Sequence, residues 1–221
     1  MCYSLEASIT AGFGLGLAGY GMVAKALRHD RRMLLFALFP VVFSAHQFVE
    51  AAVWFTRSDP VAGQPFRYLY TLIAFTMWPV LTPLAAAYAE SDPERKRIWL
   101  TMGGVGFVLA AFLIAKLVGA DGIALSVYRQ SLAYDPLFER PPLVTDFLYL
   151  LLTVTPLILS DRRAINVFGI AVLTTFFLAL AFNRPAWYSV WCLAAALFSL
   201  IIALAIEEAR SSDYDELEMQ R

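Results

Sequence analysis

The segment Met33–Phe55, MLLFALFPVVFSAHQFVEAAVWF, decides how the chain folds and where its chemistry lies. It is almost wholly apolar, and about 20 such residues cross a hydrocarbon core of ~30 Å as a helix. The same segment carries His46, Gln47 and Glu50. Ionisable groups inside hydrocarbon are destabilising unless they are paired or hydrated, so they indicate a functional site by default.

The composition of the whole chain agrees with a membrane location. Hydrophobic residues make up 60% and charged residues 16%, whereas soluble domains are about a quarter charged. The mean hydropathy is +0.64. We expect an all-α fold, a polytopic integral membrane bundle of seven transmembrane helices in residues 1–206, followed by an acidic polar tail, 207–221, that is disordered by composition. The seven apolar segments are Ala7–Leu27, Met33–Phe55, Phe66–Ala89, Ile98–Gly119, Pro142–Leu159, Ala164–Phe182 and Pro185–Ile206.

Positive charges predict the orientation of the bundle, because loops rich in Lys and Arg stay in the cytoplasm. Alternate loops and the tail hold 11 of the 17 Lys and Arg residues, which places the N-terminus outside and the C-terminus in the cytoplasm. Glu6 and no Lys or Arg precede the first segment, which argues against a cleavable signal peptide. The cytoplasmic set is Lys25, Arg28, Arg31, Arg32, Arg95, Lys96, Arg97, Arg162, Arg163, Arg210 and Arg221.

Glycines in two segments predict close helix packing. Gly14, Gly16 and Gly19 match the spacing of a dinucleotide-binding loop, but that motif needs a preceding strand, so no NAD site is expected. Small residues four apart, such as Gly12 and Gly16, instead allow a neighbouring helix to approach closely. Gly103, Gly104 and Gly106 have the same potential in the fourth segment, and such faces and the tail are where a membrane protein partner would dock.

Two further features concern the shape of the bundle. Pro79 and Pro83 should bend the third segment, which either opens a cavity beside the second or is ordinary irregular packing. The connection Ala120–Pro141 is too apolar for a solvated linker. We expect it to fold as a short amphipathic piece over the outer mouth of the bundle.

Polar groups converge on the outer half of the predicted bundle. His46 and Glu50 are four residues apart and share one helix face, with Trp54 one turn further along. Asp146 lies about one turn below the outer surface. The polar groups on this side come from five parts of the chain, namely Cys2, Glu6, His46, Gln47, Glu50, Asp146, Asn183 and Arg184.

A divalent metal of the zinc type is the sharpest interpretation of this group. His46 and Glu50 would be two ligands from one helix, and Cys2 or Asp146 could complete a tetrahedral shell. The chain has only two histidines, and His29 lies in a cytoplasmic loop. An outward-facing pocket for a small ligand is the related hypothesis, with Gln47, Asn183, Arg184 and Trp54 as contacts.

Three other hypotheses remain open. Glu50 could pair with Arg184 or Arg67 and merely stabilise the bundle. The chain could be a non-enzymatic subunit of a larger membrane complex. It could also be a metal-dependent membrane hydrolase, because Ser44, His46 and Asp146 resemble parts of the ceramidase superfamily, although the paired histidines of that superfamily's last helix are absent.

Several functions are excluded or find no support. A retinal Schiff base needs a mid-membrane lysine, and Lys25, Lys96 and Lys116 do not provide one. A bis-His haem inside the membrane is excluded by the histidine count, although His46 could be a single axial ligand. The net charge of −1 carries no information about a nucleic acid partner, and none is expected. A disulfide between Cys2 and Cys192 requires the N-terminus to fold inward, so no disulfide framework is implied.

Two short motifs carry a family resemblance: Met1-Cys2-Tyr3-Ser4 at the start, and His46-Gln47-x-x-Glu50 followed by Trp54. At these places the chain resembles an uncharacterised group of bacterial multi-helix membrane proteins, mainly over the first two helices. The resemblance transfers no function. It implies a bacterial inner-membrane location, and it implies that Cys2 and the His46–Glu50 helix face belong to one feature.

Overall fold

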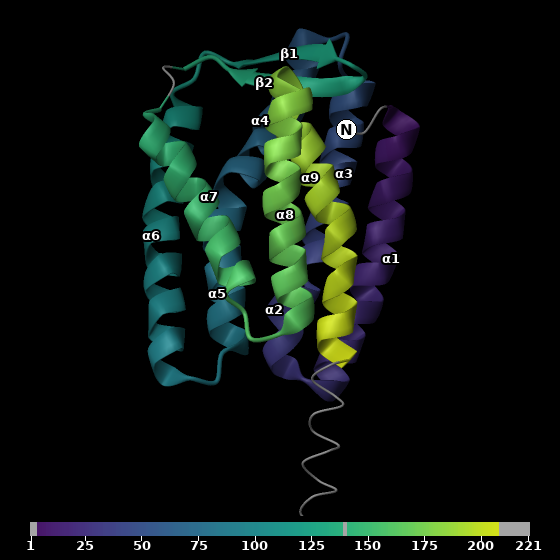
Figure 1. Cartoon of the computed structure of the whole chain (residues 1–221). Coiled ribbons are helices and arrows are strands. Elements are labelled where there is room, and N and C mark those ends of the chain that lie inside the picture. Colours follow the sequence, from purple (N-terminus) through teal and green to yellow (C-terminus); the bar gives the residue numbers. More distant parts are fainter. Residues whose placement is uncertain (1–3, 139–140, 208–221) are drawn as a thin grey trace, which may run out of the picture.

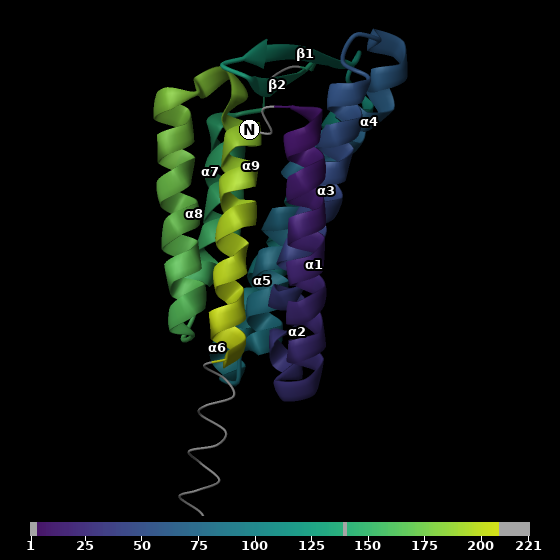
Figure 2. The same cartoon turned by 90° about the vertical axis from the view of Figure 1, so that its right-hand side faces the viewer.

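The computed structural model describes residues 4–138 and 141–207, which form a bundle of antiparallel helices with one β-hairpin lying across an end (Figures 1 and 2). The helices are α1 (Leu5–His29), α2 (Leu34–Ala37), α3 (Phe39–Phe55), α4 (Pro60–Leu72), α5 (Trp78–Ala89), α6 (Pro93–Val118), α7 (Leu143–Ile158), α8 (Arg163–Phe182) and α9 (Trp187–Phe198). Shorter elements are the 3₁₀ turns η1 (Arg31–Met33), η3 (Arg184–Ala186) and η4 (Ser199–Ile201), and the π-helical segment η2 (Ile73–Met77). The strands are β1 (Ile123–Tyr128) and β2 (Ser131–Pro136).

All seven predicted apolar segments are helical, which confirms the helical class. Six helical stretches are long and apolar enough to cross a membrane, and α7 is a shorter apolar helix of 16 residues. At 1.5 Å per residue α7 spans about 24 Å. The six are Leu5–His29, Arg31–Phe55, Pro60–Ala89, Pro93–Val118, Arg163–Phe182 and Arg184–Glu207. The predicted tail lies outside the described residues from position 208 onward.

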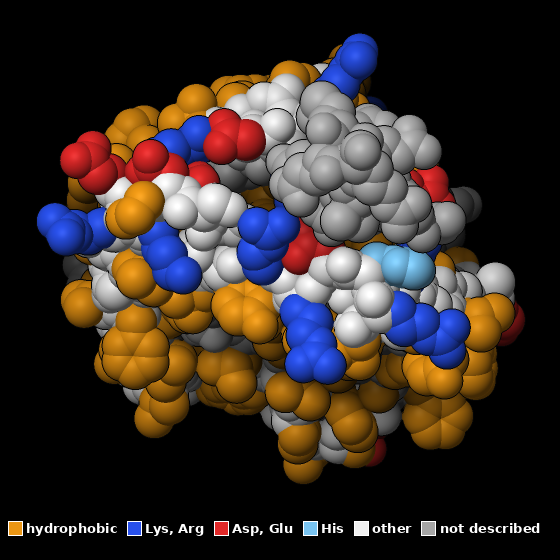
Figure 3. All heavy atoms as spheres, turned by 90° about the horizontal axis from the view of Figure 1, so that it is seen from below, with side chains coloured by type: hydrophobic (Ala, Val, Ile, Leu, Met, Phe, Trp, Pro, Cys, Tyr) orange, Lys and Arg blue, Asp and Glu red, His pale blue; other side chains and the backbone are white. Residues whose placement is uncertain are grey.

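The two ends of the bundle differ in chemistry. One end, the hairpin end, is covered by β1 and β2 (Figure 1). At the other, the charged end, acidic and basic side chains gather on the surface (Figure 3). There Asp30 pairs with Arg32 (3.1 Å) and with Arg162 (3.2 Å). Arg95 pairs with Glu90 and with Asp161. These ion pairs tie together the loops that follow α1, α5 and α7.

Glycines let α1 pack closely on α3, as the sequence predicts. A Cβ on Gly12 would lie 3.0 Å from the ring of Phe48, and one on Gly16 would lie 2.9 Å from the Ser44 hydroxyl. Ser44 Oγ also donates a hydrogen bond of 2.6 Å to the Gly12 carbonyl. Because Gly12 and Gly16 have no side chains, α3 comes close enough for the Ser44 side chain to bond the backbone of α1 directly.

The third predicted segment is not one regular helix, and its irregular part packs against α6. It consists of α4, the π-helical η2 and α5, and Pro79 is the second residue of α5, which begins directly after η2. One carbonyl in η2, that of Ala74, accepts a hydrogen bond of 2.6 Å from the Tyr149 hydroxyl on α7. A Cβ on Gly106 of α6 would lie 2.0 Å from the Pro79 carbonyl oxygen. The irregular backbone of α4–α5 is thus accommodated by a neighbouring hydroxyl and a glycine.

The segment covering the bundle is a β-hairpin. Strands β1 and β2 pair antiparallel from Ile123 with Pro136 to Tyr128 with Ser131. The turn residues Arg129 and Gln130 have φ values of 46° and 62°, as in a two-residue turn with positive φ at both central positions. Neither residue is the Asn or Gly typical of such turns, so the sequence signals no hairpin here. The connection between α6 and α7 therefore covers one end of the bundle, as expected from the sequence, and it does so as an extended β-hairpin.

Substitution of Gly106 tests the α5–α6 contact. Gly106→Ala should lower the free energy of unfolding by about 1–3 kcal/mol, because the added methyl group meets a backbone carbonyl that cannot move aside. The matched control is Gly104→Ala on the same helix, where a Cβ meets nothing within 4 Å. The control should be neutral or slightly stabilising, since alanine is the better helix former. Unfolding by a denaturing detergent gives both values, and equal stabilities for the two variants would contradict the packing described.

Candidate functional site

The polar side chains of α3 lie in the bundle interior near the hairpin end. His46, Gln47 and Glu50 each have 0% of their surface exposed. The helix carries them on the side that faces α4 and α9, while Ser44 meets α1 on the other side. Because these side chains are shielded from water, other groups inside the bundle must supply their hydrogen bonds.

His46 is held by Tyr70 of α4. The two rings stack with centroids 4.2 Å apart, and Tyr70 stacks in turn on Tyr134 of β2 at 4.0 Å. His46 Nε2 lies 3.2 Å from the Tyr70 carbonyl oxygen. A carbonyl only accepts, so in the neutral ring the hydrogen sits on Nε2 and Nδ1 keeps its lone pair. That Nδ1 atom is buried and has no hydrogen-bond partner among the described residues.

Glu50 receives donors from two helices. Ser189 Oγ of α9 donates a hydrogen bond of 2.7 Å to Oε1. Gln47 Nε2 donates a long one of 3.5 Å to Oε2. Within residues 4–138 and 141–207 Glu50 forms no ion pair with Arg67 or Arg184. Glu50 thus accepts hydrogen bonds from a hydroxyl and an amide.

Arg67 places a second charge in the same region of the bundle. Its side chain is buried, Nη1 donates 3.3 Å to the Ile123 carbonyl of β1, and Nε has no partner in the described part of the chain. The neighbouring Gln64 exchanges two hydrogen bonds with the backbone of Ile123. Tyr68 donates a further one of 2.9 Å to Ala120. Side chains of α4 therefore hold the hairpin down over His46 and Glu50.

The remaining predicted site residues are dispersed. Trp54 is buried, its indole Nε1 lacks a partner among the described residues, and the Arg57 guanidinium lies 5.4 Å from its ring. Asn183 follows α8 and donates 3.4 Å to Ser131 Oγ. Arg184 and Asp146 are exposed at the bundle surface. Cys2 lies outside the described residues, and Cys192 is a free, buried thiol.

The described residues do not bring together a full set of metal ligands. Among the described residues no three His, Cys, Asp or Glu side chains come together as a metal-binding group. His46 and Glu50 are thus not joined by Asp146. Sequence reasoning also missed Tyr70 and Ser189, which contact His46 and Glu50. A serine at position 189 within an apolar helix was the available signal, but serines in membrane helices often bond only their own backbone.

These observations define the class of protein. Its apolar helices, charged end and fully buried polar cluster are those of a multi-pass helical membrane protein in contact with a lipid bilayer. The chain belongs to a family of unknown function (DUF6629), whose profile matches residues 1–216. No curated protein and no solved structure matches the chain significantly. The family covers all seven apolar segments, whereas the resemblance noted from the sequence concerned mainly the first two.

The hydrogen bond to Glu50 can be tested by removing its donor. Ser189→Ala should lower the free energy of unfolding by about 1.5–3 kcal/mol, the usual cost of losing a bond to a charged group. Ser126→Ala on the exposed face of β1 is the matched control and should leave stability unchanged. Detergent-induced unfolding measures both. Equal stability of the two variants would show that Ser189 contributes nothing to holding Glu50.

Proposed function

We propose that the polar cluster of His46, Gln47 and Glu50 binds a metal ion or another small ligand at the hairpin end of the bundle. The observation that carries the proposal is the buried Nδ1 lone pair of His46, which has no donor among the described residues. A buried acceptor without a partner is destabilising in an apolar interior, so a ligand that occupies it would stabilise the fold.

The geometry around His46 favours a metal ion. Histidine ligands of metals commonly donate their other ring N–H to a backbone carbonyl, which fixes the tautomer. His46 has this arrangement toward Tyr70. Ser189 likewise orients the Glu50 carboxylate. We propose Cys2 as a third donor, on the ground of the sequence resemblance that links it with this helix face.

We also propose an orientation in which the hairpin end faces outward and the charged end faces the cytoplasm of a bacterial inner membrane. Support comes from the clustering of Lys and Arg in the loops of the charged end. A single cysteine in place of Ser126, in a variant without the native cysteines, should react with an impermeant thiol reagent on intact cells. One in place of Ser160 should react only after lysis, and the reverse pattern would refute the orientation.

Native mass spectrometry of the detergent-purified chain tests the binding proposal. The wild type should carry one added mass per chain, and its value distinguishes a metal ion from an organic ligand. His46→Ala should lose that mass, whereas His29→Ala, which alters an exposed histidine at the charged end, should retain it. If the bound mass is zinc, Ser189→Ala should weaken zinc affinity by about 10–100-fold, as removal of an orienting partner does.

Folding controls keep the test decisive. Each variant should elute as a single species with helical circular dichroism, and His46→Asn replaces His46→Ala if the latter does not fold. The absence of any added mass from a well-folded wild type, even after incubation with zinc, would overturn the proposal. It would leave the cluster as an internally bonded element that only stabilises the bundle.

A further inference from the structure

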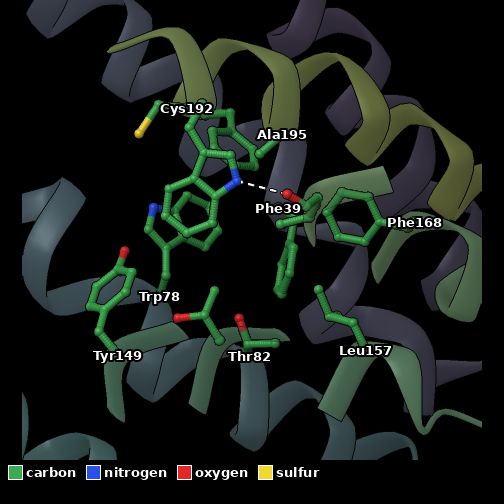
Figure 4. A pocket seen from close by; sticks show the side chains of 12 residues that line it. Phe39, Trp78, Thr82, Tyr149, Leu157, Phe168, Cys192 and Ala195 are labelled. Atoms are coloured by element: carbon green, nitrogen blue, oxygen red, sulfur yellow. Dashed lines mark hydrogen bonds between the residues drawn. The ribbon is translucent and has the colours of Figure 1, made fainter. Parts of the chain in front are cut away.

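A cavity, the central cavity, lies in the middle of the bundle between α3, α5, α7, α8 and α9 (Figure 4). Figure 4 shows the rings of Phe39, Trp78 and Phe168 around the space, with Ala195 of α9 on another side. Every residue of the wall is buried except Tyr149 of α7, which is partly exposed. The bundle therefore encloses the cavity, and the Tyr149 side chain lies between it and the outer surface of the helices.

The surface that faces the central cavity is apolar throughout. The Trp191 indole belongs to the wall, but its N–H donates a hydrogen bond of 2.9 Å to the Val172 carbonyl (dashed in Figure 4). The hydroxyls of Thr82 and Thr153 contribute no surface to the space. A buried water needs about two to four polar partners, so this cavity is dry.

The size of the central cavity restricts its ligand further. The volume is ≈ 30 Å³, and a water-sized group occupies about 10–15 Å³ of such space. The cavity thus has room for about two atoms of that size, which corresponds to a diatomic gas. Such a guest contacts aromatic rings on several sides and regains the dispersion energy that an empty space forfeits.

A second space, the charged-end pocket, has the opposite character. Its volume is ≈ 130 Å³, and its wall includes Glu90, Ser160 and Arg162. Part of its surface is polar, so water finds hydrogen-bond partners there. The larger of the two spaces is therefore hydrated, and the smaller one is left for apolar guests.

The bilayer supplies such guests to the bundle. Apolar gases dissolve better in hydrocarbon than in water, because they make no hydrogen bonds that would offset the cost of opening a space in water. Phe147 and Leu151, which precede and follow Tyr149 on α7, are large apolar side chains exposed on the outside of the bundle. Gas that is dissolved in the hydrocarbon therefore reaches the helix that forms one wall of the cavity.

We propose that the central cavity is a binding site for a small apolar gas of the size of dioxygen, taken up from the bilayer. Binding makes and breaks no covalent bond, and it is driven by dispersion contacts with the aromatic wall. The wall includes none of His46, Gln47 and Glu50. The site therefore does not depend on a ligand at the polar cluster.

Methyl NMR of the protein in lipid nanodiscs under xenon pressure tests the site. Xenon is an inert apolar atom that enters dry apolar cavities. The methyl signals of Leu157, Val172 and Ala195, which line the central cavity, should shift with xenon pressure and then level off. Ala89 lines the charged-end pocket and Ala111 is exposed on α6. Their signals should show only the small linear drift that dissolved gas produces.

Filling the cavity should remove the saturable shift. Ala195→Leu places three more carbon atoms in the space, so the shifts of Val172 and Leu157 should fall about tenfold in a packed interior. The matched control Ala111→Leu adds the same atoms on the exposed face of α6 and should leave the shifts unchanged. If Ala195→Leu does not fold, Val172→Ala is measured instead. It enlarges the space and should lower the xenon pressure at half-saturation.

Dioxygen itself is tested by its paramagnetism, which speeds the relaxation of nearby protons. Under dioxygen pressure the Ala195 methyl should relax faster than that of Ala205, a fully buried alanine that lines neither space. The excess should level off with pressure, and xenon at saturating pressure should remove it by competition.

Each contrary result overturns the proposal. Shifts that rise linearly with xenon pressure at all the cavity methyls show that no site exists. Saturable shifts that persist in Ala195→Leu, or a half-saturation pressure unchanged in Val172→Ala, place the bound xenon elsewhere. Equal relaxation of Ala195 and Ala205 under dioxygen shows that the cavity does not take the diatomic gas. None of these results depends on a mass bound at His46, so the two proposals fail independently.

Discussion

A carboxylate with no surface exposed to solvent constrains the rest of this bundle. Ser189 of α9 and Gln47 of its own helix donate hydrogen bonds to the buried Glu50. That requirement fixes how α9 must lie against α3, and the His46–Tyr70–Tyr134 ring stack fixes α4 and the hairpin in the same way. Within the described residues, Glu50 is the one charged side chain with no exposed surface, and the contacts that hold α4, α9 and the hairpin meet at the same face of α3.

Close contacts at glycine positions let the helices of the bundle pack tightly. Glycines of α1 and α6 let those helices approach α3 and α5 without side chains between them. The close approach matters because α5 follows an irregular π-helical turn and contains prolines, and its free carbonyls need neighbours that can reach them. The Tyr149 hydroxyl supplies a hydrogen bond to one of these carbonyls, that of Ala74 in the π-helical turn, and Gly106 leaves room for the Pro79 carbonyl.

The two ends are closed by different interactions. Hydrogen bonds from α4 hold a β-hairpin over one end, whereas ion pairs among three loops hold the other. Between them the interior changes from a polar cluster to an aromatic cavity with two threonines and then to a charged pocket.

The sequence by itself determined the class of fold, because hydropathy and length dictate where helices must cross a bilayer. It also placed His46, Gln47 and Glu50 on one helix and identified Gly12 and Gly16 as packing positions, since these properties depend on local spacing. It named Gly103, Gly104 and Gly106 alike, whereas in the structure Gly104 meets no neighbour. Only the tertiary structure decided that Ser189, Tyr70 and the hairpin surround Glu50 and His46, while Asp146 and Arg184 lie at the surface. The physical reason is that the rotation of each helix about its own axis is set by long-range contacts between residues far apart in the chain, and apolar helices of nearly uniform hydrophobicity carry little local record of that rotation.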